Sequence, residues 1–390
     1  MVRLGDVCDV RDGTHDSPQY VNDGYPLVTS KNIMDGDIDF TDVNYISEVD
    51  FHKINQRSKV DDGDIIMPMI GTIGKPVIVN TNTFFAIKNV ALIKFIENKV
   101  SNIFIKYLLD SSIFANYVEH ENRGGTQKFL SLGNIRKFSF PLPPLGEQKR
   151  IAKALDLASE IVKGYKEQLA GLDKLVQSVF YEMFGDPVTN EKGWEICSIK
   201  NIVRSAVSNG FFAKRNDYTP IGNVAILGVA NIVNCMYSRI HNLPKTNATP
   251  LEIDKFSVSY GDLLFCRSSL VAEGIGKASI APPNTPKGIL FECHVIRVPI
   301  DMSICVPEFI QVQTTTNYFR NQIISQSKTS TMTTIGQSGI LKSNVILPPL
   351  PLQTRFASIV TAIEAQKAQV QKAITEAENL FNSLMQEYFE

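Results

Sequence analysis

The sequence lacks the features that mark most metal-binding, secreted and membrane proteins. Its six cysteines are scattered through 390 residues without a C-x-x-C pair, so neither a structural zinc site nor a disulfide framework is expected. No apolar run approaches the ~20 residues that span a bilayer, and the N-terminus does not read as a signal peptide. These absences predict a cytoplasmic protein that binds no metal and no membrane.

Motifs of nucleotide-binding and methyl-transferring enzymes are also missing. No P-loop occurs, and Gly274–Lys277 is a lone G-x-G. The segment Ala281-Pro282-Pro283-Asn284 runs in the opposite direction to the Asn/Asp-Pro-Pro-aromatic motif of an adenine methyltransferase. The aspartates between Asp35 and Asp42 lack the glycine and the glutamate of a calcium loop. We therefore expect a solvated acidic loop there and no catalytic residues in the chain.

The net charge of −1 favours neither a nucleic acid nor a membrane as partner. The charges are unevenly distributed, however. Residues 191–346 carry 15 basic and 10 acidic side chains, whereas residues 1–140 carry 15 basic and 18 acidic ones. This basic excess is weaker than that of most DNA-binding domains. If the chain binds DNA, a partner with its own positive charge is expected to help.

The chain contains an internal duplication. The segment FPLPPLGEQKRIA at 140–152 recurs as ILPPLPLQTRFA at 346–357, an offset of 205 residues. Gly74-Lys75 likewise matches Gly276-Lys277 at an offset of 202, and the first matches in the chain have an offset of 195. An ordered series of matches whose offset grows along the chain is the result of small loop insertions in one copy. We therefore divide the chain into two repeats.

Each repeat is predicted to begin with short strands, such as 76–79 and 89–93, separated by Asp-Gly and other glycine-containing turns. A single helix is then expected from Ile103 to Tyr117, with its copy from Pro307 to Ile323, where proline suits the first helical turn. A Pro-Pro segment follows and precedes a long helix in both repeats.

The long helix of the first repeat is predicted from Glu147 to Phe184, which contain no proline. Apolar residues with alternating spacings of four and three form a seam typical of a coiled coil: Ile151, Leu155, Ala158, Val162, Tyr165, Leu169, Leu172, Val176, Val179 and Met183. A shift of 205 residues gives nine apolar residues and Lys367. Packing on its own domain is the alternative, but globular helices average only about 11–12 residues. Two such helices related by a pseudo-twofold axis would pair antiparallel, with the globular regions at opposite ends of a rod roughly 55 Å long.

This arrangement resembles the specificity subunit of type I restriction–modification systems over essentially the whole chain. The weaker matches are Val2–Val7, Gly63–Ile66 with its copy Gly261–Leu264, and Gly71–Gly74. The strongest are the helix starts already described and Phe184-Gly185-Asp186-Pro187. The second repeat departs from the pattern, because its helix start lacks the Gly-Glu of the first and because Gly222–Val229 differs from Pro26–Lys31. These departures bear on which bases are read.

The resemblance implies an α+β fold in which two mixed α/β target-recognition domains are separated by two long helices that form an antiparallel coiled coil. The expected divisions are a first target-recognition domain at 1–146, a first long spacer helix and linker at 147–190, a second target-recognition domain at 191–350, and a second long spacer helix at 351–390.

The resemblance also implies that each domain reads one half of a bipartite site in double-stranded DNA. Partners would be two adenine-N6 methyltransferase (modification) subunits and, for cleavage, ATP-driven restriction subunits. S-adenosylmethionine, ATP and Mg would be bound by those subunits, and this chain would bind no cofactor. Two alternatives stay open: a coiled-coil scaffold that binds only proteins, and a fused fragment of a DNA methyltransferase or nuclease. The repeats fill the chain, which leaves no room for the catalytic domain of the second alternative.

Candidate DNA contacts are polar side chains in loops, which can reach base edges or phosphates. In the first repeat they are Arg11, Lys31, Asn32, Thr72, Lys75, Arg123, Thr126, Gln127 and Lys128. In the second repeat they are Asn209, Lys214, Arg215, Asn231, Arg267, Ser268, Ser269, Lys277, Lys328, Thr329 and Thr331. The segment 123–128 is favoured because it places a Gly-Gly pair beside a guanidinium, an amide and an ammonium, although a solvated loop is the alternative. Elsewhere the alternative is an ordinary surface or turn residue. Asn32 and Asn231, at equivalent places, are equally suited to hold a turn.

Overall fold

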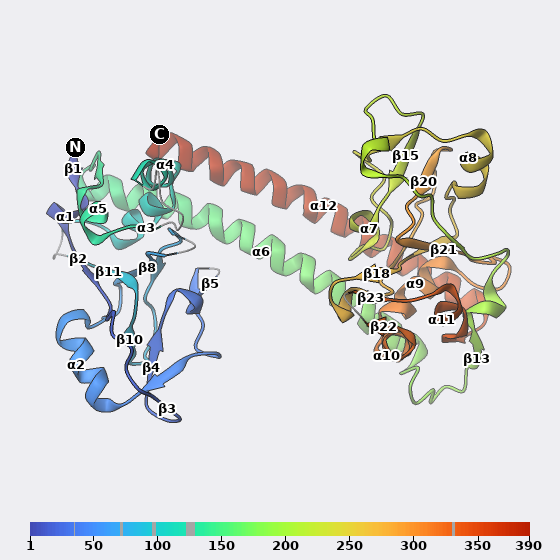
Figure 1. Ribbon diagram of the computed structural model, residues 1–390, viewed down its shortest axis with the longest axis horizontal. Coiled ribbons are helices and arrows are strands. Elements are labelled where there is room, and N and C mark those ends of the chain that lie inside the picture. Colours follow the sequence, from blue (N-terminus) through green and yellow to red (C-terminus); the bar gives the residue numbers. More distant parts are fainter. Residues whose placement is uncertain (35, 71–72, 96–98, 122–128, 330–331) are drawn as a thin grey trace. The chain divides into compact units, whose positions relative to one another are not determined.

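The structure is a computed structural model that describes residues 1–34, 36–70, 73–95, 99–121, 129–329 and 332–390. The chain forms two compact units (Figure 1). The first unit comprises Met1–Lys166 and Lys372–Glu390, and the second unit comprises Glu167–Gln371. Each unit therefore contains one repeat together with one half of each long helix.

The first repeat begins with short strands and ends with helices. In chain order its elements are β1 (Val2–Arg3), α1 (Leu4–Val7), β2 (Cys8–Asp12), β3 (Tyr20–Val21), β4 (Tyr25–Val28), a 3₁₀ turn (Ser30–Asn32), β5 (Ile33–Met34), β6 (Asp37–Ile38), β7 (Asn44–Ile46), α2 (Glu48–Ser58), β8 (Ile65–Pro68), β9 (Val77–Ile78), β10 (Ala86–Ile87), β11 (Val90–Phe95), α3 (Asn102–Asp110), α4 (Ser112–Glu121), α5 (Leu132–Lys137), β12 (Ser139–Phe140) and the long helix α6 (Leu145–Phe184).

The second repeat has a closely similar order. Its elements are β13 (Glu195–Ser198), a 3₁₀ turn (Ile199–Ile202), β14 (Ser208–Asn209), a 3₁₀ turn (Arg215–Asp217), β15 (Val224–Leu227), α7 (Val229–Ile232), β16 (Lys245–Thr246), α8 (Pro250–Phe256), β17 (Asp262–Cys266), β18 (Ser268–Ser269), a 3₁₀ turn (Ala272–Gly274), β19 (Ala278–Ile280), β20 (Ile289–Phe291), β21 (Val295–Pro299), α9 (Pro307–Thr315), α10 (Asn317–Gln326), β22 (Lys328–Thr329), β23 (Thr333–Thr334), α11 (Gln337–Lys342), β24 (Asn344–Leu347) and the long helix α12 (Leu350–Phe389).

The sheet register confirms the duplication. An antiparallel sheet with the order β2-β11-β8-β9 in the first unit corresponds to one with the order β14-β21-β17-β19 in the second unit. Ala91 pairs with Met67 in the first sheet, and Ile296 pairs with Phe265 in the second. A second sheet in each unit contains a parallel pair, β4 with β10 and β15 with β20. The mixed α/β character predicted for both repeats is therefore present.

The helix predicted from Ile103 to Tyr117 is divided into α3 and α4, so that prediction was wrong. Its copy is divided into α9 and α10 at the equivalent position, Thr316. The Thr316 hydroxyl donates to the carbonyl of Gln313 at 2.7 Å, and it accepts from the N–H of Phe319 at 3.4 Å. One side chain thus closes α9 and caps α10. The apolar spacing continues through the break, so it gave no signal of the cap.

The two long helices pack together as an antiparallel pair, as predicted (Figure 1). Every position of the predicted seam is buried or half-buried in both helices. In the first unit Lys166 pairs with Glu378, and in the second unit Asp173 pairs with Lys367, each at 2.7 Å. From the first ion pair to the second, the α6 residue number rises from 166 to 173 while the α12 residue number falls from 378 to 367. The two helices therefore run antiparallel.

A buried glutamine fixes the start of each long helix. The amide of Gln148 donates to the carbonyl of Pro143 and accepts from the N–H of Ser101, both at 2.9 Å. Gln353 makes the equivalent two bonds at 2.7 and 3.0 Å. Both glutamines match in the sequence repeat, and this shared role ties each helix to the globular part of its unit. Among the described helices, none combines the length and the apolarity needed to cross a bilayer.

Candidate nucleic-acid interface

In the second unit, a small three-stranded sheet gathers several of the predicted contacts. It consists of β18, β23 and β22, which lie side by side in Figure 1. Ser268 pairs with Thr334, and Lys328 pairs with the same residue from the other side. The predicted stretches around positions 268 and 328, which are far apart in the sequence, therefore meet on one ribbon. Hydroxyl groups and an exposed ammonium group line this ribbon, and both can bind base edges or phosphates.

Arg267 joins this ribbon to the main sheet. Its carbonyl accepts from the N–H of Ile335 at 3.0 Å, and its guanidinium donates to the carbonyl of Cys293 at 3.2 Å. The neighbouring His294 is exposed, with Nδ1 3.5 Å from the Ser268 hydroxyl. The sequence did not identify His294 as a candidate contact. In the sequence it stands out only as the neighbour of a cysteine, whereas the folded chain places it beside the ribbon.

The first unit has the equivalent edge. Ile70 bridges Phe129, and the N–H of Leu130 donates to the carbonyl of Met69 at 2.9 Å, as Ile335 does to Arg267. Lys75, just beyond this edge, is exposed and has a positive φ of 58°. Six of the candidates lie outside the described residues, and their roles stay predictions: Thr72, Arg123, Thr126, Gln127, Lys128 and Thr331.

The two equivalent asparagines hold turns. Asn32 is buried, and its Oδ1 accepts from the N–H and the hydroxyl of Thr29, both at 3.0 Å. Its Nδ2 donates to the carbonyls of Asp39 at 3.2 Å and Asp42 at 2.9 Å. Because all polar atoms of this amide are engaged inside the loop, the turn alternative holds for Asn32. Asn231 makes the equivalent bond to a backbone N–H three residues earlier, at 3.0 Å.

The remaining described candidates are not on the strands of the ribbon. Arg11 and Asn209 are on the equivalent strands β2 and β14, and the guanidinium of Arg11 is paired with Asp9 at 2.7 Å. Lys277 comes after the loop that follows β18, and its ammonium donates to Asn234 Oδ1 at 2.7 Å. Lys31 and Lys214 are exposed, whereas the Arg215 side chain is outside the description.

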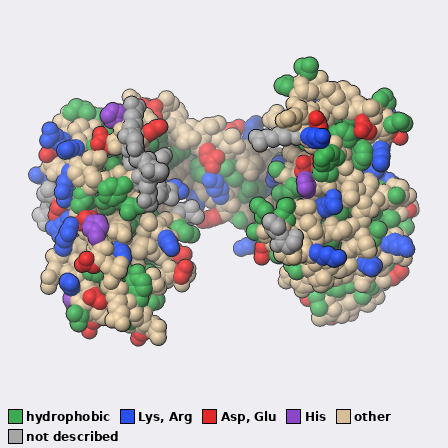
Figure 2. Space-filling model, viewed as in Figure 1, with side chains coloured by type: hydrophobic (Ala, Val, Ile, Leu, Met, Phe, Trp, Pro, Cys, Tyr) green, Lys and Arg blue, Asp and Glu red, His purple; other side chains and the backbone are tan. Residues whose placement is uncertain are grey.

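Basic side chains are dispersed on the face shown in Figure 2. On the face that Figure 2 presents, lysine and arginine side chains are scattered over each unit among uncharged atoms and do not form one basic strip. This dispersion agrees with the modest basic excess of residues 191–346. A phosphate backbone would therefore meet no single basic strip on this face.

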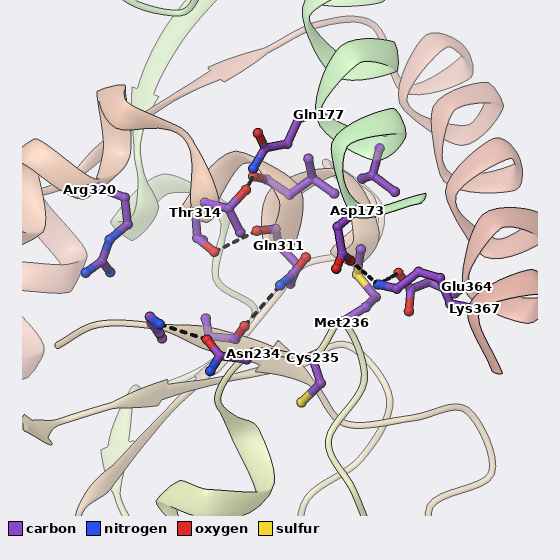
Figure 3. A pocket seen from close by; sticks show the side chains of 15 residues that line it. Asp173, Gln177, Asn234, Cys235, Met236, Gln311, Thr314, Arg320, Glu364 and Lys367 are labelled. Atoms are coloured by element: carbon purple, nitrogen blue, oxygen red, sulfur yellow. Dashed lines mark hydrogen bonds and ion pairs between the residues drawn. The ribbon is translucent and has the colours of Figure 1, made fainter. Parts of the chain in front are cut away.

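A cavity of about 400 Å³ in the second unit lies where α9 and β19 meet the long helices (Figure 3). The Lys367 ammonium, at the polar position of the seam, lies 2.7 Å from carboxylate oxygens of Asp173 and Glu364. Burial opposes the charge of Lys367, but these hydrogen bonds outweigh it and raise the pKa of the ammonium. An equivalent cavity of about 360 Å³ in the first unit has Val162 at this place. The cavity of the first unit is lined by the two long helices alone, whereas that of the second unit is also lined by Lys277 and Arg320.

Within the described ranges, no three His, Cys, Asp or Glu side chains are grouped so that they could hold a metal ion. Burial raises the pKa of the Cys8 and Cys305 thiols to about 12. Such thiols stay protonated and are poor nucleophiles.

The sequence is similar to known DNA specificity proteins. Residues 1–170 match the family model described as the type I restriction modification DNA specificity domain. The specificity subunit of the type I restriction enzyme EcoKI from Escherichia coli strain K12 is 23% identical, and the match covers 94% of this chain and 81% of that subunit.

Solved structures share the fold. The S subunit of a type I restriction–modification system from M. genitalium has a TM-score of 0.57 at 12% identity, with 100% of this chain and 95% of that chain covered. A chain from a study of complex assembly and conformational transition in the type I R-M system has a TM-score of 0.56 at 18% identity, with 99% of this chain and 96% of that chain covered. At these identities the similarity establishes the fold alone. The predicted fold class is thereby confirmed.

The role of Asn32 can be tested by Asn32→Asp, which keeps an acceptor for Thr29 but removes both donors. The carbonyls of Asp39 and Asp42 would lose their partners and face a carboxylate. We expect the free energy of unfolding of the full chain to fall by about 2–4 kcal/mol in urea titrations. Lys31→Ala, at the exposed neighbour, is the control and should change it by less than ~0.5 kcal/mol. A similarly small change for Asn32→Asp would contradict the turn assignment.

Proposed function

Because this chain belongs to the family of type I restriction–modification DNA specificity subunits, we propose that it directs a modification complex to a bipartite DNA sequence. Each unit reads one half of the target, and the chain itself performs no chemistry. The relatives found are named specificity subunits, which supports a non-catalytic role. We place the protein in the cytoplasm, where its DNA target is accessible.

The observation that carries this proposal is an edge present in both units, which we call the reading edge. It lies at Met69 and Ile70 in the first unit and at Arg267 and Ser268 in the second. The bond from Leu130 to Met69 in the first unit has its counterpart from Ile335 to Arg267 in the second. The backbone geometry is therefore kept, while the side chains on it differ, with Ile70 where the second unit has Ser268. Two similar frames with different side chains suit the reading of two different half-sites, because the backbone positions the protein and side chains select the bases.

The chemistry in this proposal belongs to partner subunits. Two modification subunits would bind S-adenosylmethionine and methylate adenine, and restriction subunits would bind ATP and Mg and cleave the DNA. This chain would bind none of these cofactors. The dispersed charge on the face shown in Figure 2 supports the same division, since the partners would supply part of the positive charge that holds the phosphates.

We place the docking surface for the modification subunits on the long helices. Leu157, Ile161 and Leu175 of α6 are 52, 48 and 44% exposed. Gly164 and Gly171 lie on the same stripe, because the spacings 157, 161, 164, 168, 171, 175 alternate between four and three. A Cβ added at either glycine would meet no atom within 4 Å, so packing inside this chain does not require glycine there. A second heptad seam with two glycines allows a partner helix to approach α6 closely.

The two-reader proposal predicts that the halves of the target exchange separately. Replacing residues 1–140 with the corresponding part of a homologue should change one half of the methylated motif and leave the other half unchanged. Replacing residues 191–346 should change only the other half. The motifs are read by sequencing methylated adenines in cells that also express the modification subunit. A change in both halves after either replacement would contradict one reader per unit.

The docking proposal predicts opposite effects of Gly164→Ala plus Gly171→Ala on stability and on assembly. The isolated chain should gain about 1 kcal/mol per glycine in its free energy of unfolding, because alanine favours the helix. The affinity for the modification subunit should fall by about tenfold or more, since the added methyl groups overpack the contact.

Gly146→Ala is the matched control, because this glycine also has open space around its Cβ position and lies outside the stripe. It should leave the affinity for the modification subunit unchanged. Unchanged affinity of the double variant, measured by calorimetry, would place the docking surface elsewhere.

A further inference from the structure

The second unit has an insertion at its reading edge. Ser268 pairs with Thr334 where Ile70 bridges Phe129, so the two edges start at equivalent residues. In the first repeat three residues separate Ile70 from the next matching glycine, Gly74. In the second repeat seven residues separate Ser268 from the corresponding Gly276. The second unit therefore has four more residues in this loop, and Leu270 and Val271 lie in that longer loop.

The inserted loop is well fixed by hydrogen bonds. The N–H of Val271 donates to the Ser269 hydroxyl at 3.2 Å, and the N–H of Gly274 donates to the Val271 carbonyl at 3.1 Å. The N–H of Gly276 donates to the Cys266 carbonyl at 2.8 Å, which closes the loop onto the main sheet. The Arg320 guanidinium holds the far side through the carbonyl of Glu273 at 3.1 Å.

Two large apolar side chains are presented outward from this fixed loop. Leu270 is 81% exposed and Val271 is 58% exposed, whereas Ile275 in the same loop is fully buried. The loop therefore buries one apolar side chain in the core and leaves two in water. Burial of a leucine stabilises a protein by about 1.5–3 kcal/mol, so the fold of the unit gains no stability from this exposure.

The surroundings of Leu270 indicate what covers it. It follows directly after the ribbon that carries Ser268, Ser269, Thr334 and Lys328. Hydroxyl and ammonium groups on this ribbon suit the base edges of the major groove and the phosphates beside it. The one apolar group that a base displays in this groove is the C5-methyl of thymine. Two apolar residues are too few for a stable protein interface, which needs about 1,000 Å².

We propose that Leu270, flanked by Val271, contacts the 5-methyl group of a thymine in the half-site read by the second unit. The inference rests on the proposed function and adds to it the base group that the inserted loop recognises. Ser268 and Ser269 lie beside this contact as hydrogen-bonding groups for base edges, and Lys328 is placed to meet a phosphate. In the sequence of the first repeat, the loop that is four residues shorter has no residue corresponding to Leu270.

The test compares thymine with deoxyuridine, which lacks only the methyl group. The full chain in complex with its modification subunit is titrated with duplexes that carry its methylated target, with each thymine of the second half-site replaced in turn by deoxyuridine. On the proposed function each half-site contains an adenine to be methylated, and the thymine opposite it is one of the positions tested. For the natural sequence, one replacement should weaken binding about fourfold, the effect of returning one methyl group to water.

At the position where the replacement weakens binding of the natural sequence, the Leu270→Ala variant should bind the thymine and deoxyuridine duplexes equally. Its affinity for the thymine duplex should fall to the affinity that the natural sequence has for the deoxyuridine duplex. Leu251→Ala removes another leucine that is 84% exposed, on α8, and should retain the fourfold difference. Replacements in the first half-site should have the same effect on Leu270→Ala as on the natural sequence.

Three results would overturn the inference. The first is that no deoxyuridine replacement in the second half-site weakens binding. The second is that Leu270→Ala retains the full thymine preference. The third is that Leu270→Ala loses the modification subunit while its relative affinities for the duplexes are unchanged, which would make Leu270 a protein contact. Failure of the proposed function gives a different result, because the natural complex would then not prefer its bipartite target over unrelated DNA.

Discussion

The packing of α6 against α12 is the interaction on which the rest of the structure depends. In the second unit Phe180, Phe184 and Phe356 are almost fully buried and pack around Phe309 of α9. In the first unit the other ends of the same helices bury Ile151 and Leu155 in the core, beside the ring of Phe389. Each globular core is therefore completed by both long helices. Loss of one of the buried phenylalanines costs about 3–5 kcal/mol, so a unit cannot keep its core if the helix pair separates.

The duplication shows which interactions are constrained and which are free to vary. Each repeat keeps a buried aspartate at the start of a central strand, Asp64 in one and Asp262 in the other. Burial raises the pKa of both carboxyl groups, and a cation opposes the shift in each. That cation is Lys94 from β11 in the first repeat and Arg204, which follows a 3₁₀ turn, in the second, each at 2.5 Å. The buried charge must be paired, but the pairing residue can come from a different element. The loops at the reading edge have no such requirement, and there the repeats differ in length.

The sequence was sufficient to predict the long helices, their antiparallel pairing and the duplication, because seam spacing and matched motifs are local signals. It did not predict the breaks at Ser111 and Thr316, since a single hydroxyl cap leaves the apolar spacing intact. The ribbon that unites positions 268 and 328 depends on strand pairing across about 60 residues, which spacing does not reveal. Leu270, which we propose as a contact, was not among the sequence candidates because these were sought among polar residues, and only the folded chain shows that its side chain is exposed.

The central claim is that the paired helices set the distance between two independent readers. One heptad inserted into each helix, between the two ion pairs Lys166–Glu378 and Asp173–Lys367, preserves the seam. Each insertion adds about 10.5 Å of helix, which corresponds to about three base pairs at ~3.4 Å each. The added base pairs also rotate one half-site about the DNA axis, so some affinity is expected to be lost. The measurement is the methylated motif of the extended protein, read by sequencing. We expect unchanged half-sites separated by about three more base pairs; an unchanged gap in a folded, active variant would show that the paired helices do not set the distance.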